Sequence, residues 1–233
     1  MLEIIAFDAD DTLWHNERLY SEAQAKLVGL LSQYDIEGVE EKLYARELEN
    51  IPIYGYGIKS FTLSMIELAI ELTKGRIKAV DIAEIIGIAK GMLTAEVDLF
   101  EHAESTVKEL ARDYDLMVIT KGDLLDQESK LKRSGIDTYF RCVEIVSEKS
   151  GEVYNSILKK YNVKPEKFLM VGNSLRSDVA PIVQIGAHAV YVPYHLTWAH
   201  ENLGDEHVDP STYHQIENLG QLPALVARIS NAR

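Results

Sequence analysis

Cysteine, basic residues and long apolar runs are all scarce in this sequence. Cys142 is the single cysteine among 233 residues, so no intramolecular disulfide can form and we expect a reducing, cytoplasmic environment. Lysine and arginine number 24 against 37 acidic residues, for a formal net charge of −13. This charge disfavours nucleic acid and anionic membranes as partners. No apolar run approaches the roughly 18 residues of a membrane-spanning helix, and no basic-then-apolar leader is present, so we expect a soluble protein.

Apolar residues make up 46% of the chain, enough for a sizeable core. Short apolar runs alternate with helical patterns after residue 98, which is typical of a doubly wound α/β fold with a parallel sheet. The expected strands are Ile4–Phe7, Leu116–Ile119, Cys142–Val146, Phe168–Val171, Ala189–Val192 and a short Tyr213–Ile216. The expected helices between and after them are 105–111, a helix ending at 131, 153–161, 179–185 and 222–229.

Residues 15–98 contain helical periodicity and no convincing strand, which predicts a helical subdomain inserted after the first strand. Residues 1–14 and 99–233 would then form the α/β core. Ser21 is the expected cap of a first helix over 22–31. Pro52 and the glycines near it predict an ordered loop over 50–59, in which Tyr54 and Tyr56 either contact a ligand or pack between helices.

The most informative stretch follows the first strand, where Asp8, Asp10 and Asp11 are joined by Thr12. Each like-charge contact at roughly 4 Å costs on the order of 4 kcal/mol at an effective dielectric near 20. Such a cluster is tolerated when a cation lies among the acids or when one acid stays protonated, and oxygen ligands favour Mg²⁺. The alternative is a turn in which Asp11 or Thr12 caps the next helix.

Polar residues also follow the later strands. Thr120 ends the second, Lys149 follows the third, and Gly172 and Asn173 follow the fourth. The carboxyl ends of parallel strands share one edge of a sheet, so these segments are expected to converge on Asp8. Acids that hold a metal, together with a lysine and backbone amides that neutralise an anion, indicate phosphoryl transfer.

These four segments, in this order, resemble the motifs of the haloacid dehalogenase superfamily of aspartate-nucleophile hydrolases. The helical insertion resembles the helical cap of that family. The resemblance implies that Asp8 attacks phosphorus and that Asp10 protonates the leaving oxygen and then activates water. It also implies that Thr120 holds phosphate and that Lys149 pairs with both Asp8 and the phosphate.

The resemblance further implies substrate contacts from Thr12, Lys121 and Gly122, to which Tyr54 and Tyr56 of the insertion are added as candidates. An acid at the position of Asp10 favours phosphatases over dehalogenases, because an alkoxide leaving group needs a proton and a halide does not.

One departure concerns the metal. The usual fourth motif begins Gly-Asp, whereas this chain has Gly172 and Asn173. The expected Mg²⁺ ligands are therefore Asp8, Asp10 and Asp178, with Asn173 binding directly or through water, and the neutral amide predicts weaker binding.

The sequence therefore predicts a Mg²⁺-dependent phosphatase that acts on a small phosphorylated metabolite through an aspartyl phosphate, with a homodimer as a possible assembly. Three alternatives remain open: a phosphomutase, a dehalogenase-type hydrolase, and a catalytically weak anion-binding module.

Overall fold

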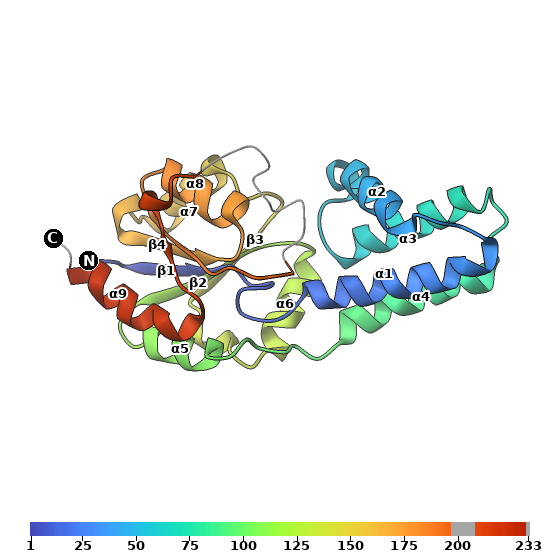
Figure 1. Ribbon diagram of the computed structural model, residues 1–233. Helices are drawn as coiled ribbons and strands as arrows, with labels where there is room; N and C mark the ends of the chain where they lie inside the picture. The colour runs from blue at the N-terminus through green and yellow to red at the C-terminus, as the bar shows by residue number, and fades with distance from the viewer. Residues whose placement is uncertain (197–207, 232–233) are drawn as a thin grey trace. The chain divides into compact units, whose positions relative to one another are not determined.

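The structure is a computed structural model that describes residues 1–196 and 208–231 (Figure 1). Its described residues include one six-stranded sheet in the order β3-β2-β1-β4-β5-β6, in which every neighbouring pair is parallel. The strands are β1 (Ile4–Phe7), β2 (Asp115–Lys121), β3 (Cys142–Val146), β4 (Phe168–Gly172), β5 (His188–Tyr191) and β6 (His214–Gln215). The predicted doubly wound parallel sheet is confirmed.

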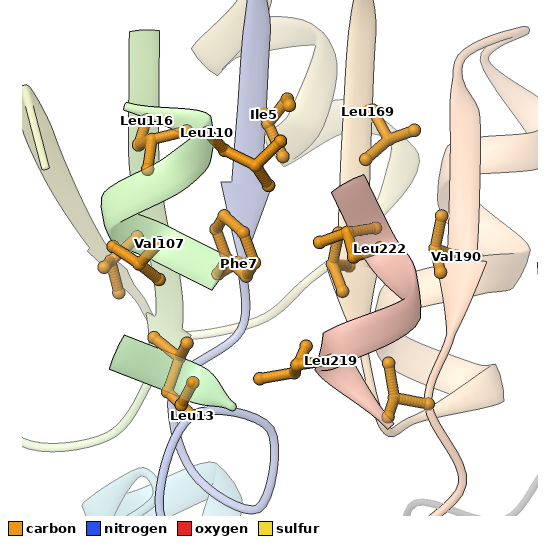
Figure 2. Packing of buried hydrophobic residues seen from close by; sticks show 14 of the residues in the cluster. Ile5, Phe7, Leu13, Val107, Leu110, Leu116, Leu169, Val190, Leu219 and Leu222 are labelled. Carbon is orange, nitrogen blue, oxygen red and sulfur yellow. The ribbon is translucent and has the colours of Figure 1, made fainter. Parts of the chain in front are cut away.

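Side chains along each inner strand alternate between two cores, because successive residues of a strand point to opposite faces of the sheet. On β1, Ile5 and Phe7 join one core while Ile4 and Ala6 join the other. The first core packs against α5 (Ala103–Leu110) and α9 (Leu222–Asn231), as Figure 2 shows. The second packs against α7 (Gly151–Tyr161) and α8 (Ala180–Gln184). Coverage on both faces explains why the strands are continuously apolar.

The chain forms two compact units. The first comprises Met1–Glu17, Val97–Lys121 and Glu128–Arg233, and the second comprises Arg18–Glu96 and Gly122–Gln127. Helix α6 (Leu124–Arg133) begins in the second unit and continues in the first.

The second unit is built mainly from α1 (Glu17–Leu31), α2 (Val39–Tyr54), α3 (Ile58–Leu72) and α4 (Ala79–Thr94). It has its own apolar core, in which Leu27, Leu43, Met65 and Ile85 are fully buried. Within the described ranges, no helix combines the length and apolar content needed to cross a bilayer.

Two predictions for the helical region are wrong. Helix α1 begins at Glu17 rather than after Ser21, because the Asp11 carboxylate accepts the backbone N–H groups of Asn16 and Glu17 and supplies the cap. Helix α2 continues through Pro52 to Tyr54, so the loop expected over 50–59 is reduced to the turn at 55–57. Pro52 lacks the N–H that would donate to the Leu48 carbonyl, and the helix ends two residues later at Tyr54.

Candidate active site

The candidate site lies at the carboxyl edge of the sheet, where β1 has β2 on one side and β4 on the other. Chain order reverses at this point, and ligands of open α/β sheets bind outside such switch points. Phe7 pairs with Val118 of β2 and with Val171 of β4. The next residue, Asp8, extends the pairing because its N–H donates to the Val171 carbonyl at 2.9 Å. The sheet register therefore fixes the backbone of Asp8 beside Gly172.

Asp8 is joined to Lys149 and Asp178 in a buried network of three charged side chains. The Lys149 ammonium donates to Asp8 Oδ1 at 2.5 Å and to Asp178 Oδ1 at 2.7 Å. Lys149 lies between β3 and α7, where Ser150 caps α7 by accepting the N–H of Val153. Burial of two carboxylates beside one ammonium is costly unless each charge is paired and hydrogen-bonded, which is the arrangement here.

The pKa values of this network depart from their ordinary values. Burial raises the pKa of Asp8 to about 7; Lys149 opposes the rise and Asp178 adds to it. Burial acts to lower the pKa of Lys149, but Asp178 and Asp8 raise it well above its usual value. The lysine is therefore a permanent cation beside the Asp8 carboxylate.

Thr12 links Asp8 to the loop that follows β4. Its hydroxyl lies 3.1 Å from Asp8 Oδ2 and 3.2 Å from Asn173 Oδ1. Both oxygens therefore converge on one hydroxyl group. Asp11, the remaining acid of the cluster, caps α1 as described above, and burial raises its pKa to about 6. The first motif thus contains both a cap and a cluster of reactive groups.

Asp178 is held tightly against the backbone of β4. Its Oδ2 accepts the Ser174 N–H at 3.0 Å, and a Cβ added to Gly172 would lie only 2.2 Å from that oxygen. Only glycine permits this approach of a carboxylate to the strand. With Oδ1 bonded to Lys149, Asp178 fixes the position of the lysine ammonium.

Residues at the end of β2 border the same network. Thr120 is buried, and Lys121 donates from Nζ to the Ser177 hydroxyl at 3.0 Å and lies 3.9 Å from Glu148. Gly122 has a φ of +130°, a conformation that favours glycine and turns the chain after the strand.

Asp10 has two partners that the sequence did not predict. The indole Nε1 of Trp14 donates to its Oδ1 at 2.7 Å, and Lys130 of α6 donates to both carboxylate oxygens at 2.8 Å. Lys130 also donates to Asn16 Oδ1 at 3.2 Å. The sequence contains one indication of this contact: the polar residues Asp126 and Lys130 of α6 are one helical turn apart and so lie on the same face. The sequence does not distinguish a buried polar face of this helix from an exposed one.

Tyr54 and Tyr56, the predicted ligand contacts of the insertion, belong to the second unit. The Tyr54 hydroxyl donates to Glu67 Oε1 at 2.9 Å, and this bond raises the pKa of Tyr54. Glu67 also accepts from Asn50 at 2.9 Å. A role for either tyrosine in substrate binding stays a prediction.

The oxygen donors around Asp8 fit a hard cation only in part. Asp8 and Asn173 present converging carboxylate and amide oxygens, the donor type that Mg²⁺ prefers. In contrast, Asp178 is bonded to Lys149 and to a backbone amide, and Asp10 is bonded to Lys130. Among the described residues, no group of three or more histidine, cysteine or acidic side chains is arranged to hold a metal. Among the groups described here, the oxygens of Asp8 and Asn173 are therefore the ones whose chemistry suits Mg²⁺.

Comparison with known proteins agrees with this geometry. The family model of the haloacid dehalogenase-like hydrolases matches residues 2–186. A glyceraldehyde 3-phosphate phosphatase from Pyrococcus furiosus is 28% identical over 206 residues, covering 83% of this chain and 81% of that protein. The human N-acylneuraminate-9-phosphatase is 24% identical over 238 residues, covering 97% and 94%.

A solved structure extends the likeness across the fold. A haloacid dehalogenase-like family hydrolase from Xanthomonas campestris superimposes with a TM-score of 0.87 and 38% identity, covering 98% of this chain and 91% of that one. The chain belongs to the haloacid dehalogenase-like hydrolases, and the family predicted from the four motifs is confirmed.

Proposed function

We propose that this protein is a phosphatase that hydrolyses a small phosphorylated metabolite through an aspartyl phosphate formed on Asp8. The observation that carries the proposal is the buried Asp8 carboxylate at the switch point of the sheet, held by the Lys149 ammonium and the Thr12 hydroxyl. Asp10 lies on the loop that follows, and the relatives named above are phosphatases.

In the first half-reaction, a carboxylate oxygen of Asp8 forms a bond to phosphorus and the bond to the leaving oxygen breaks. Asp10, protonated at that moment, gives its proton to the leaving oxygen, which departs as an alcohol. Lys149 offsets the charge that accumulates on the phosphoryl oxygens, and Thr120 with the amide that follows it holds those oxygens.

In the second half-reaction, Asp10 as a carboxylate takes a proton from water while the water oxygen attacks phosphorus. The bond between phosphorus and Asp8 breaks, which releases inorganic phosphate and leaves both acids as they began. A bound Mg²⁺, contacted by Asp8, the Asp10 carbonyl and Asn173, would supply further charge neutralisation at the phosphoryl group. Asp178 would support this metal site mainly by holding Lys149.

We further propose that residues 15–98 form a cap that selects the leaving group, with Tyr54 and Tyr56 as candidate contacts, and that Thr12, Lys121 and Gly122 contact the phosphate. The self-contained apolar core of the helical unit supports its treatment as a separate module. A cytoplasmic location and a homodimer remain predictions, and light scattering of the purified protein tests the second.

The first experiment is hydrolysis of p-nitrophenyl phosphate with and without Mg²⁺ by the wild type, Asp8→Asn and Asp10→Asn, each shown to be folded by its melting temperature. Metal-dependent release of phosphate that is lost in both variants supports the proposal, and a panel of phosphorylated metabolites then identifies the substrate. A folded wild type with no turnover of that panel would contradict it and favour the anion-binding module. Chloride release from 2-chloropropionate would instead indicate a dehalogenase.

A further inference from the structure

Helix α6 buries polar side chains beside Leu131, which packs into the first core. Asp126 and Lys130 are buried, whereas Leu124 and Leu125 are 60% and 68% exposed. Charged residues of a surface helix usually lie on its exposed face. The buried face of α6 therefore does more than fill the core.

The Lys130 side chain is only 8% exposed although lysine can usually extend its ammonium to water. It contacts three oxygens: Asp10 Oδ1 and Oδ2 at 2.8 Å each, and Asn16 Oδ1 at 3.2 Å. A buried ammonium is costly unless it is paired, so this lysine is held in place by the groups it contacts.

The Asp10 carboxylate is restrained from two directions. Lys130 contacts both of its oxygens, and the indole N–H of Trp14, a side chain that is 1% exposed, donates to Oδ1 at 2.7 Å. Two donors from separate segments restrict the rotation of the carboxyl group about the Cβ–Cγ bond of Asp10. A proton-transfer group gains most from such restraint, because misplacement by about 1 Å can cost on the order of 10²-fold in rate.

We propose that Lys130 is a positioning residue for Asp10, which it holds at the orientation needed for proton transfer to the leaving oxygen. The inference rests on the proposed function, in which Asp10 is the acid and base. Loss of Lys130 should therefore lower kcat/KM for esters whose leaving oxygen needs a proton. It should leave kcat/KM nearly unchanged for esters with a good leaving group.

The test compares Lys130→Met with Lys132→Met, a matched control in which an exposed lysine of the same helix is replaced. We measure kcat/KM, which includes leaving-group departure, for 2,4-dinitrophenyl phosphate, phenyl phosphate and an alkyl phosphate. We expect K130M to reduce kcat/KM for the alkyl phosphate by about 10²-fold and for the dinitrophenyl ester by less than about threefold, since general acid catalysis is worth roughly 10²–10⁴-fold. An equal loss for all three esters, or no loss, overturns the proposal.

A double mutant tests whether Lys130 acts through Asp10. In an Asp10→Asn background, replacing Lys130 should change kcat/KM for the alkyl phosphate by less than about threefold, because residues that act as a unit are not additive. A loss that multiplies with that of Asp10→Asn overturns the proposal. Lys130→Arg keeps the charge and should restore part of the discrimination between leaving groups.

A spectroscopic readout does not depend on turnover. The indole N–H of Trp14, assigned by Trp14→Phe, reports on its bond to Asp10 through its NMR shift, and we expect K130M and D10N to move it in the same direction while K132M does not. An indole signal that moves in D10N but not in K130M overturns the proposal. If the wild type shows no phosphatase activity, the proposed function fails, and this signal still decides whether Lys130 positions Asp10.

Discussion

Asp8 is buried and Glu47 is partly buried; each carboxylic acid has a raised pKa, one in each unit, but their surroundings differ. Burial raises the pKa of Asp8 to about 7 and that of Glu47, on α2, to about 8. Asp8 is bonded to Lys149 and Thr12. Glu47 Oε1 has no hydrogen-bond partner among the described residues, and burial is the sole cause of its shift.

The contrast shows that a raised pKa does not by itself identify a reactive group. The pKa of Glu47 is raised because burial disfavours its charged form and no neighbouring cation opposes that effect. Asp8 is held between opposing influences, since burial favours its acid form and Lys149 favours its carboxylate. A carboxylate nucleophile needs an environment like that of Asp8, in which the charged form can be populated. The cation that favours this form is also suited to bind phosphate.

The largest expected difference between these acids is in activity. Asp8→Asn should reduce kcat by at least about 10⁴-fold, as loss of a nucleophile does in other enzymes. Glu47→Gln, which preserves the size of the side chain, should change kcat toward p-nitrophenyl phosphate by less than about threefold. Steady-state kinetics of both variants at saturating Mg²⁺ make the comparison. A comparable loss in the two variants would mean that Asp8 and Glu47 do not differ in their importance for activity.

The second prediction concerns Lys149, the cation that pairs with Asp8. Lys149→Met leaves Asp8 and Asp178 as neighbouring buried acids with no cation between them, and breaking a buried pair typically costs about 3–5 kcal/mol. We expect a loss of this size in the free energy of unfolding at pH 8, measured by urea titration. Lys159→Met, at an exposed position of α7, is the control and should lie within about 0.5 kcal/mol of the wild type. A K149M protein as stable as the control would mean that the network contributes little to folding.

The Asp8 network was predictable because strand ends are predictable. Parallel strands are apolar runs, their carboxyl ends share one edge, and so Asp8, Thr120 and Lys149 could be assigned to the same region without coordinates. Lys130 could not, because a polar face of a helix looks the same in sequence whether it meets water or a buried carboxylate.

The boundaries of α1 and α2 were missed for a related reason. The cap of α1 comes from Asp11, several residues before the helix, whereas the apolar pattern places the cap at Ser21. In α2, Pro52 and the nearby glycines predict a break, whereas the helix includes Pro52 and ends only at Tyr54. Both outcomes depend on tertiary position rather than on local residue preference.

The third prediction uses the sign of the Glu47 shift. Its pKa is about 8 in the folded protein against an ordinary value of 4.5, so the folded state retains a proton that the unfolded state loses between these values. The stability associated with this proton is complete below pH 4.5 and is lost as the pH rises through 8. The full pKa shift corresponds to at most about 5 kcal/mol in the free energy of unfolding. Access of water to the carboxyl group reduces this value, so we expect about 2–3 kcal/mol.

Glu47→Gln removes this titration. The variant should match the wild type near pH 4.5 and exceed its free energy of unfolding by about 2–3 kcal/mol at pH 9. Glu84→Gln, at an exposed position of α4, is the control and should leave the difference between the two pH values unchanged. A wild type and an E47Q protein with parallel stability curves from pH 4.5 to pH 9 would show that Glu47 is not buried as an acid.

The smallest expected effect concerns the metal beside Asp8. Asn173 offers a neutral amide oxygen where it converges with the Asp8 carboxylate, and a neutral ligand attracts a divalent cation less than a charged one. Asn173→Asp should therefore tighten Mg²⁺ binding by about tenfold, as measured by calorimetry on the folded protein without substrate. Asn155→Asp, which adds the same charge at an exposed position of α7, separates this local effect from the change in net charge. If N173D and N155D bind Mg²⁺ equally, the converging oxygens of Asp8 and Asn173 do not form the metal site, and the charge balance around Asp8 is then set by Lys149 together with Asp178 and Asp10.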